Sequence, residues 1–563
     1  MTRPGETGAI RKTSADAIPV ALVYPNAYKI GMGNLGFQFV YQYLNDHPRF
    51  SAERVFFPDP ALDRKQGPQR PISEESARPL KGFSVIAFSV PFENDYPAIP
   101  AALMAAGIPP LQEDRGSGDP LVIAGGVSVS MNPEPLARFL DIAFIGEMED
   151  EPTSKGFFSA LAESMTRGSA DLGHGLRFLE NFKDVPGAYV PSAYSFDFDE
   201  RGLIKDISAL SGFPQRVRSV KRLSKEGPVP VSVLFSPEAE FGKSLLVEIN
   251  RGCSNACRFC SSGWINLPVR HALFERFRDE VEEAVASGNS VGLIGSHLAG
   301  HPQLGVILRS IVEQGGRFSL SSIRPEGLTP ETIRLMAQTG QKTATLAPEV
   351  ASARLKRVIG KEIPSERFYE LIPQLVSEGI PHVRFYFMVG LPTETDEDAR
   401  EIVDFVLNCR KIFVDASRPK KTIGRIAVQL NPFVPKPFTP FQWAGMATVN
   451  VLEKRLRIVQ QGLKGAPNLV VRTESPRQAL VQAVLSRGDR RLEGALLAAA
   501  RQNGKWPGVF KKEGVDPALY ATRERTKDEV LPWDVVDHGV SKETLWKVYR
   551  KALSQDDANV RQA

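Results

Sequence analysis

Short apolar runs alternate with amphipathic stretches six times between residues 245 and 430. The apolar runs have the length and composition of buried strands: 245–249, 290–295, 318–323, 343–347, 383–389 and 426–430. The stretches between them carry apolar residues at helical spacing. Apolar strands that alternate with helices predict a parallel sheet covered by helices. We therefore expect an α/β fold with a partial (β/α)6 barrel, in which the chemistry lies at the carboxyl ends of the strands.

Three of the four cysteines lie within eight positions, directly after the first of these strands. They are Cys253, Cys257 and Cys260, while Cys409 follows about 150 residues later in a predicted helix. Thiolates are soft ligands that suit iron–sulfur clusters or zinc. A structural zinc site normally takes four protein ligands. Three thiolates on one loop would leave one iron of a four-iron cluster open to a reacting molecule.

The cysteine count and the charge indicate the kind of protein and its compartment. Four cysteines with three in one motif argue against a disulfide framework and for a reducing compartment. The net charge of +5 is small for 563 residues, which gives no argument for nucleic acid or a membrane surface. The N-terminus has no apolar signal core, and no run reaches the ~18 apolar residues of a spanning helix. We expect a cytoplasmic protein.

The C-x3-C-x2-C spacing, with Phe259 just before the last cysteine, resembles the signature of the radical S-adenosylmethionine (SAM) superfamily. This resemblance implies that Cys253, Cys257 and Cys260 hold a [4Fe–4S] cluster and that SAM chelates the open iron. It also implies an external electron donor of the flavodoxin or ferredoxin kind. SAM would then be cleaved to a 5′-deoxyadenosyl radical. The alternative from the residues alone is a structural or zinc-binding cysteine cluster.

The N-terminal region has a second set of buried strands, which predicts another parallel sheet. They are residues 18–24, 85–90, 121–126 and 142–146, with ligands expected at their carboxyl ends. The region resembles the Rossmann-like cobalamin (B12)-binding domain that precedes many radical SAM cores. The cofactor contacts that this resemblance implies are Asn34, Gly36, Ser89, Gly125, Gly126 and Glu147. The segment from Asn26 to Gly31 lacks the histidine that ligates cobalt in some of these domains. The alternative is a domain that has lost the cofactor and covers the active site.

The resemblance to the superfamily also assigns SAM contacts at the ends of the barrel strands. They are Phe259, Gly295, Ser296, Ser322, Arg324, Glu349, Gly390 and Pro392. For Arg324 and Glu349 the alternative is a mutual ion pair, and for Gly390 and Pro392 it is a tight turn that Thr395 closes as a helix cap. His297 and His301 have a spacing that would suit a metal in a helix. Gly300 and Pro302 favour a loop, so lining of the active site or surface polarity is preferred.

We expect five segments along the chain. They are a flexible tail at 1–17, a cobalamin-binding-type domain at 18–165, a linker or subdomain at 166–238, the radical SAM core at 239–445 and a helical C-terminal domain at 446–563. Further motifs resemble a largely uncharacterised group of fused cobalamin-type/radical SAM proteins. They are residues 431–443, 474–476, 487–490 and 531–534.

The resemblance implies methylation of an unactivated carbon in a small-molecule or peptide substrate. The first alternative is a cobalamin-independent rearrangement, cyclisation or sulfur insertion. A non-catalytic sensor of iron or redox state is the alternative of another class.

Overall fold

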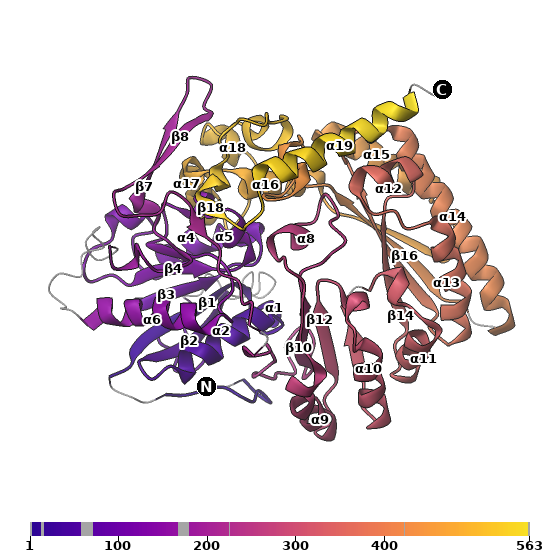
Figure 1. Cartoon of the computed structure of the whole chain (residues 1–563), viewed down its shortest axis with the longest axis horizontal. Coiled ribbons are helices and arrows are strands. Elements are labelled where there is room, and N and C mark those ends of the chain that lie inside the picture. The colour runs from indigo at the N-terminus through magenta and orange to yellow at the C-terminus, as the bar shows by residue number, and fades with distance from the viewer. Residues whose placement is uncertain are drawn as a thin grey trace. The chain divides into compact units, whose positions relative to one another are not determined.

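The computed structural model describes residues 3–12, 16–57, 71–166, 180–224, 226–321, 323–420 and 423–560, with side chains to residue 554. The chain divides into two compact units, each built from three chain segments. Unit 1 contains Met1–Lys243, Val484–Tyr520 and Asp528–Gly539, and unit 2 contains Ser244–Ala483, Ala521–Lys527 and Val540–Ala563 (Figure 1). The region 446–563, which the sequence predicts as one helical domain, is therefore divided between the two units.

A six-stranded sheet forms the centre of unit 1, in the order β2-β1-β3-β4-β5-β6. The strands are β1 (Ile18–Ala27), β2 (Phe50–Phe57), β3 (Val85–Ser89), β4 (Leu121–Gly125), β5 (Ile142–Phe144) and β6 (Ala188–Tyr189). Pairing is parallel from β2 to β5, and β6 joins the edge in the antiparallel direction. The first five strands thus have the doubly wound order 2-1-3-4-5, which confirms the Rossmann-like prediction.

Helices and a hairpin complete unit 1. The helices are α1 (Tyr28–Met32), α2 (Leu35–Asp46), α4 (Ala98–Ala105), α5 (Val127–Met131), α6 (Glu151–Thr166), α17 (Glu493–Arg501) and α18 (Val509–Lys512). Strands β7 (Tyr194–Phe198) and β8 (Ile204–Ala209) form an antiparallel hairpin. The short strand β18 (Val536–Asp537) pairs in parallel with β9 (Val217–Arg218), so a late segment of the chain is built into this unit.

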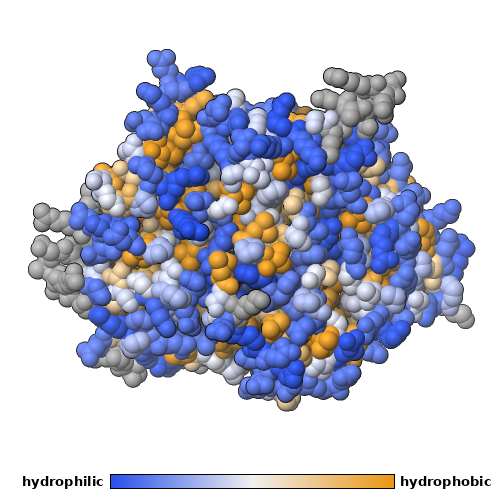
Figure 2. Space-filling view, viewed as in Figure 1, coloured by the Kyte–Doolittle hydropathy of each residue, from blue (hydrophilic) through white to orange (hydrophobic). Residues whose placement is uncertain are grey.

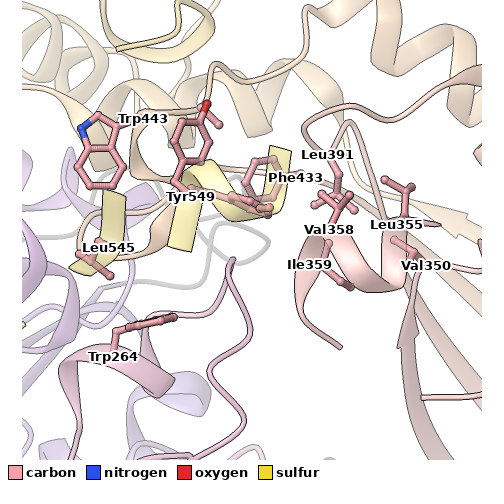
Figure 3. Packing of buried hydrophobic residues seen from close by; sticks show 13 residues of the cluster. Trp264, Val350, Leu355, Val358, Ile359, Leu391, Phe433, Trp443, Leu545 and Tyr549 are labelled. Atoms are coloured by element: carbon pink, nitrogen blue, oxygen red, sulfur yellow. The ribbon is translucent and has the colours of Figure 1, made fainter. Parts of the chain in front are cut away.

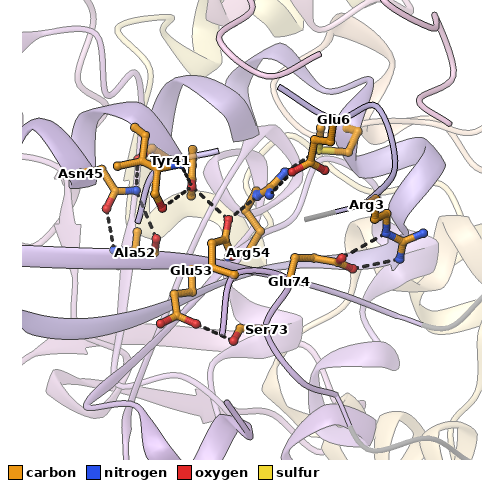
Figure 4. A network of polar contacts seen from close by, with 12 residues as sticks. Arg3, Glu6, Tyr41, Asn45, Ala52, Glu53, Arg54, Ser73 and Glu74 are labelled. Atoms are coloured by element: carbon orange, nitrogen blue, oxygen red, sulfur yellow. Dashed lines mark hydrogen bonds and ion pairs between the residues drawn. The ribbon is translucent and has the colours of Figure 1, made fainter. Parts of the chain in front are cut away.

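A buried polar network attaches the N-terminal segment to this sheet. Arg54 on β2 is fully buried and pairs with Glu6 and Glu75, each at 2.6 Å (Figure 4). Arg3 pairs with Glu74, and Thr7 exchanges backbone hydrogen bonds with Phe235. The sequence predicts a flexible tail for residues 1–17, yet the described residues of this segment make specific contacts. The reason is that buried charges require partners wherever the chain can supply them.

Unit 2 contains two four-stranded sheets. The first has the order β11-β10-β12-β13 and the second the order β14-β15-β16-β17. The first sheet is formed by β10 (Leu245–Arg251), β11 (Arg270–His271), β12 (Val291–Gly295) and β13 (Phe318–Leu320), and the second by β14 (Thr343–Glu349), β15 (His382–Val389), β16 (Arg425–Pro432) and β17 (Leu469–Thr473). All pairs are parallel except β10 with β11. The six predicted barrel strands are therefore present, and β17 adds a seventh parallel strand within the predicted helical region.

Helices follow the strands of unit 2 in the expected alternation. They are α8 (Ser262–Ile265), α9 (Arg278–Ala286), α10 (Leu304–Glu313), α11 (Pro330–Gln338), α12 (Ala353–Ile359), α13 (Ser365–Ser377), α14 (Asp396–Ser417), α15 (Val449–Gly462) and α19 (Lys542–Val560). Helix α16 (Pro476–Arg487) spans the boundary between the two units. One face of β15 packs on α14, where the rings of Phe385 and Phe387 each contact Phe405. The other face of the second sheet, called the open face, lines a cavity.

An aromatic cluster in unit 2 packs beside the cysteine loop. Trp264 of α8, Trp443 and Tyr549 of α19 are almost completely buried in it, together with Val358 and Leu391 (Figure 3). The ring centroids of Trp443 and Tyr549 lie 6.0 Å apart, with the ring planes tilted by 33°. Helix α19 lies about 300 positions after the cysteines in the sequence. Burial of these large rings therefore fixes the last helix against the core that carries the cysteine motif.

Polar and apolar residues are mixed on the surface. On the face seen in Figure 2 blue residues predominate, and the orange ones form scattered patches. Among the described residues, no helix combines the length and apolar character that crossing a membrane requires.

Candidate active site

The cysteine loop begins where β10 ends, in a backbone conformation that requires glycine. Gly252 has φ +86°, and a Cβ placed on it would lie 2.5 Å from the carbonyl oxygen of Asn266. Ala256 also has a positive φ, of 49°. A non-glycine residue in this conformation is uncommon, and such positions concentrate at functional sites. The local fold therefore constrains the loop between the first and second cysteines tightly.

The three thiols of the motif are free and differ in their surroundings. Cys257 is buried, which raises its pKa, while the positive charges of Lys361 and Arg324 act in the opposite direction. Burial also raises the pKa of Cys260, opposed by the backbone N–H groups of Ser262 and Gly263. The amide of Asn255 donates to the Cys253 sulfur at 3.1 Å. Cations and N–H donors around the sulfurs favour thiolates, the form that binds iron.

The residues between and after the cysteines anchor the loop. The guanidinium of Arg258 donates to the carbonyls of Arg357 and Val358 at the end of α12, at 2.6 and 2.8 Å. Trp264 donates from its indole N–H to the carbonyl of Cys257 at 3.1 Å. Phe259 packs against the aromatic cluster of Figure 3. The aromatic residue that was expected near SAM thus has a packing contact on the apolar side of the loop.

Within the described residues, no three His, Cys, Asp or Glu side chains are gathered closely enough to hold a single metal ion. A four-iron cluster binds each thiolate through a different iron, so its ligands are spread over the cluster instead of meeting at one point. The chemistry of the donor set, three free thiols on a short constrained loop with cations nearby, fits a cluster.

The end of β12 is joined to β10 through Asn250. The side-chain oxygen of Asn250 accepts from the N–H of His297 at 2.7 Å, and its backbone carbonyl accepts from Ser296. A Cβ on Gly295 would lie 3.1 Å from the Asn250 Cβ, so glycine allows this close approach. Gly295 and Ser296, both expected at the SAM amine, therefore lie at the strand end beside the cysteine strand, as predicted.

His301 is a structural residue and not the surface residue that the sequence allowed. It is buried, its Nδ1 accepts from the N–H of Gln303 and its Nε2 donates to the carbonyl of Ala272 at 2.9 Å. Burial lowers its pKa, which keeps the ring neutral. His271, which sequence reasoning did not select, contacts the His301 ring at 5.1 Å between centroids.

Glu349 and Arg324 do not pair with each other in the described structure. Glu349 pairs with Lys361 at 2.8 Å, and Arg324 has Glu326 at 3.5 Å and the Cys257 sulfur at 4.0 Å. Glu349 has φ +68° at a register shift at the end of β14. The alternative of a mutual ion pair is therefore wrong. Ser322 lies outside the described residues.

The turn after β15 is closed by Glu394. Its carboxylate accepts from the backbone N–H groups of Gly390 and Leu391, and Arg455 approaches it to 3.3 Å. Burial raises the pKa of Glu394 to about 7, opposed by Arg455 and the two N–H groups. Thr395 caps α14 as expected, in a capping box with Asp398. Pro392 lies inside this turn, so the Gly390 and Pro392 backbone is held in one shape.

In unit 1 the carboxyl ends of β1 and β3 meet where the sheet order reverses. The side chain of Asn26, at the end of β1, donates to Asp95 in the loop after β3 at 2.9 Å. Burial raises the pKa of Asp95 to about 6. Ligands of doubly wound sheets bind at such a switch point. Sequence reasoning did not select Asp95, because the signal for it is the strand order and not a local motif.

Most residues expected to contact cobalamin have internal structural partners. Asn34 caps α2 by accepting from the N–H of Phe37, and Gly36 lies next to it. Gly126 has φ +113° and is packed against the carbonyl of Val90. Glu147 accepts from the N–H of Arg222.

Gly125 is different, because a Cβ on it would meet no atom closer than 3.8 Å. Ser89 ends β3 beside it in register. These two positions remain available to a ligand.

Large apolar side chains are exposed in the segments that follow three adjacent strands of this sheet. They are Ile30 after β1, Phe92 after β3 and Val127 after β4, with 43%, 42% and 44% of their surface exposed. Exposed apolar side chains at the carboxyl ends of the strands, where ligands of such sheets bind, can contact an apolar part of a ligand.

Two family models match the chain. The model described as "Radical SAM proteins, N-terminal" matches residues 36–191, and the model of the radical SAM superfamily matches residues 247–406. The second range contains the cysteine loop and the strand ends from β10 to β15.

The chain is also similar to individual proteins. An uncharacterised protein of Methanocaldococcus jannaschii is 27% identical over 512 residues, which covers 88% of this chain and 97% of that protein. The ribosomal protein uS12 methylthiotransferase RimO of Pelotomaculum thermopropionicum is 25% identical, and the match covers 53% of this chain and 68% of that protein.

Among solved structures, the methyltransferase TsrM from Kitasatospora setae, with cobalamin and a [4Fe–4S] cluster bound, shares the fold. It has a TM-score of 0.50 at 14% identity, and the match covers 88% of this chain and 99% of TsrM.

Proposed function

This chain belongs to the radical SAM superfamily, and on that premise we propose that it methylates an unactivated carbon of its substrate with the help of cobalamin. The cysteine loop at the end of β10 is the observation that carries the proposal. Its three free thiols lie on a backbone that glycine and positive φ angles constrain, next to two cations.

Cys253, Cys257 and Cys260 would hold the [4Fe–4S] cluster. With SAM and an electron from an external donor of the flavodoxin or ferredoxin kind, that cluster supplies a 5′-deoxyadenosyl radical able to remove a hydrogen atom from carbon. The positive charges of Lys361 and Arg324 would favour the thiolate form of Cys257. Trp264 and Phe259 place apolar surface beside the loop and limit the access of water.

The strand ends of unit 2 would bind SAM. Gly295 and Ser296 lie at the strand end beside the cysteine strand, and Glu349 offers a carboxylate held by Lys361. The N–H groups of Gly390 and Leu391 are occupied by Glu394, so this turn would contact an adenine ring through its shape and its carbonyls. Ser322 and Pro392 complete the proposed set.

The switch point of unit 1 would bind cobalamin. The 2-1-3-4-5 strand order, the open Cβ position of Gly125 and the exposed apolar residues Ile30, Phe92 and Val127 support a large, partly apolar cofactor there. A bound cobalamin supplies methyl transfer to carbon. The loop after β1 has no histidine, so the cobalt would have no ligand from that loop.

A second candidate is a radical reaction without cobalamin, such as sulfur insertion. Asn34, Gly126 and Glu147, which the resemblance assigns to cobalamin, all have structural partners within unit 1. The similarity to a methylthiotransferase also supports this candidate.

The test uses the full chain, reconstituted with iron and sulfide without oxygen, reduced and incubated with SAM. We would quantify 5′-deoxyadenosine and S-adenosylhomocysteine with and without hydroxocobalamin. Both products rising only with cobalamin is the expected result. Deoxyadenosine formed to the same extent without cobalamin would favour the second candidate. A Cys253→Ala, Cys257→Ala, Cys260→Ala triple variant should lose cluster absorbance and SAM cleavage, and retained cleavage would overturn the assignment.

A variant at the switch point of unit 1 distinguishes a loss of cobalamin binding from a loss of folding. Gly125→Val fills the open position at the end of β4, where β-branched residues suit a strand, and should reduce the cobalamin retained after gel filtration. Gly116→Val is the matched control, because a Cβ at Gly116 meets nothing within 4 Å. Equal cobalamin retention in both variants would argue against cobalamin binding at this switch point.

A further inference from the structure

The open face of the second sheet of unit 2 carries a cluster of arginines around a cavity. The cavity has a volume of about 410 Å³ and is lined by β14 to β17. Its charged side chains are Arg384, Arg425 and Arg472, with His382 beside them. Because strand side chains alternate, these residues point away from the face on which Phe385 and Phe387 meet α14.

None of these three guanidinium groups has an acidic partner among the described residues. Elsewhere in unit 2, arginines such as Arg354, Arg400 and Arg455 pair with carboxylates. The cavity lining contains no Asp or Glu, and its other polar groups are Thr343, Tyr386 and Gln429. Charges of one sign that line the same concave site repel one another and focus the electric field there. A ligand with negative charge relieves this repulsion.

The strand register places the three arginines at three successive levels. Arg425 pairs in register with His382 near the start of the strands, Arg384 lies beside Ala427, and Arg472 lies beside Gln429. A strand rises about 3.3 Å per residue, so Arg384 lies roughly 20 Å and Arg472 roughly 13 Å below the level of Gly390. An anion held here would thus be well separated from the carboxyl ends where the chemistry is proposed.

We propose that this cavity binds the anionic end of an elongated substrate, through phosphate or carboxylate groups, while the carbon to be modified reaches the carboxyl ends of the strands. The fork of an arginine matches both groups with two parallel hydrogen bonds. A volume of about 410 Å³ suits a small molecule or one end of it. The role as substrate rests on the proposed function, whereas the binding of an anion does not.

The test is isothermal titration calorimetry on the full, cluster-loaded chain with inorganic phosphate and, separately, with glutarate. Sodium chloride at matched ionic strength is the blank. Saturable binding is expected, and the tighter probe shows whether the substrate carries phosphate or carboxylate. Arg384→Gln and Arg472→Gln should each weaken it about tenfold or more, as expected for a lost charged hydrogen bond. Arg384→Lys should weaken it less, because the charge remains while the fork is lost.

Arg400→Gln is the matched control, since Arg400 is an exposed arginine of α14 that pairs with Glu397. Its affinity should equal that of the wild type. Absence of binding by both probes, or equal affinities in all variants, would overturn the proposal. Anion binding without SAM cleavage would support the arginine site and overturn the proposed function. SAM cleavage without anion binding would overturn the arginine site and leave the proposed function supported.

Discussion

At the scale of single residues, Glu394 controls the shape of the turn after β15, and its carboxyl group changes its protonation state near neutral pH. Its raised pKa of about 7 means that the folded chain holds a proton which the unfolded chain releases near pH 4.5. The stabilisation is therefore complete below about pH 4.5 and is lost as the pH rises to about 7. At 1.36 kcal/mol per pKa unit, the loss amounts to about 3 kcal/mol.

We predict that Glu394→Gln removes this dependence, because the amide resembles the protonated acid. Urea denaturation across this pH range should show the free energy of unfolding of the variant rising relative to wild type as the pH rises. Glu397→Gln is the control, since that carboxylate is exposed in the next turn. The opposite result would be a free energy of unfolding of the wild type that increases relative to that of the variant between about pH 4.5 and 7. It would show that Arg455 and the two N–H groups keep the carboxylate ionised.

The residues that the sequence identified are those with a local signal. Cys253, Cys257 and Cys260 are recognisable by spacing, and Thr395 by its position ahead of a helix. Lys361 beside Cys257, and Asp95 beside Asn26, had no such signal. They lie in other segments of the chain and meet their partners only after the sheets form. Such contacts depend on the order of the strands in the sheet, which the local pattern of residues along the sequence does not reveal.

At the scale of elements, the junction of β15 and α14 depends on Gly390. Its φ is +93°, and a Cβ there would lie 2.4 Å from Leu452 of α15. We predict that Gly390→Ala lowers the free energy of unfolding by about 2 to 4 kcal/mol, from strain and overlap together. Gly305→Ala in α10 is the control and should gain up to about 1 kcal/mol, because its Cβ would meet no atom closer than 3.6 Å.

Adding Leu452→Ala separates the two causes. The double variant should lose less stability than the sum of the single losses, since the overlap disappears while the strain remains. Additive losses in urea denaturation would mean that the overlap with Leu452 contributes nothing.

The N-terminal segment offers a second prediction at this scale. Glu6→Gln removes a charge that pairs with the fully buried Arg54, and should cost about 2 to 4 kcal/mol because a buried cation loses a partner. Glu238→Gln, which loses an exposed pair with Arg3, should cost less than about 1 kcal/mol. Thermal melting of both variants checks this. Equal, small changes would support the flexible tail that the sequence predicts.

At the scale of the whole molecule, the alternation of strands and helices predicted the architecture. It did not predict which segments of the chain form each of the two compact units. The apolar runs were sufficient for β10 to β16, because buried parallel strands have a strong local signal. Strand β17 and the late segments of unit 1 were missed. Residues 484–520 and 528–539 belong to unit 1 through Arg490, His538 and β18, and each of these contacts spans more than 290 positions of sequence.

This division predicts that the N-terminal unit is not independent of the C-terminal part of the chain. Arg490 pairs at 2.8 Å with Glu134, which is fully buried, and His538 donates to the carbonyl of Ser130. A fragment of residues 1–243 lacks both partners. Leaving one buried carboxylate unpaired costs about 3 to 5 kcal/mol, a large part of the 5 to 15 kcal/mol that stabilises a typical domain.

We expect the fragment 1–243 to melt without cooperativity and to be degraded rapidly by trypsin, whereas the same fragment joined by a flexible linker to residues 484–539 should melt cooperatively. The linked form restores Arg490, His538 and the pairing of β18 with β9, which are the contacts that the shorter fragment loses. Calorimetry and limited proteolysis of the two fragments check this. Cooperative melting of residues 1–243 at the temperature of the linked form would contradict this expectation. It would mean that the N-terminal unit folds without residues 484–539, as the domain border expected from the sequence between residues 165 and 238 implies.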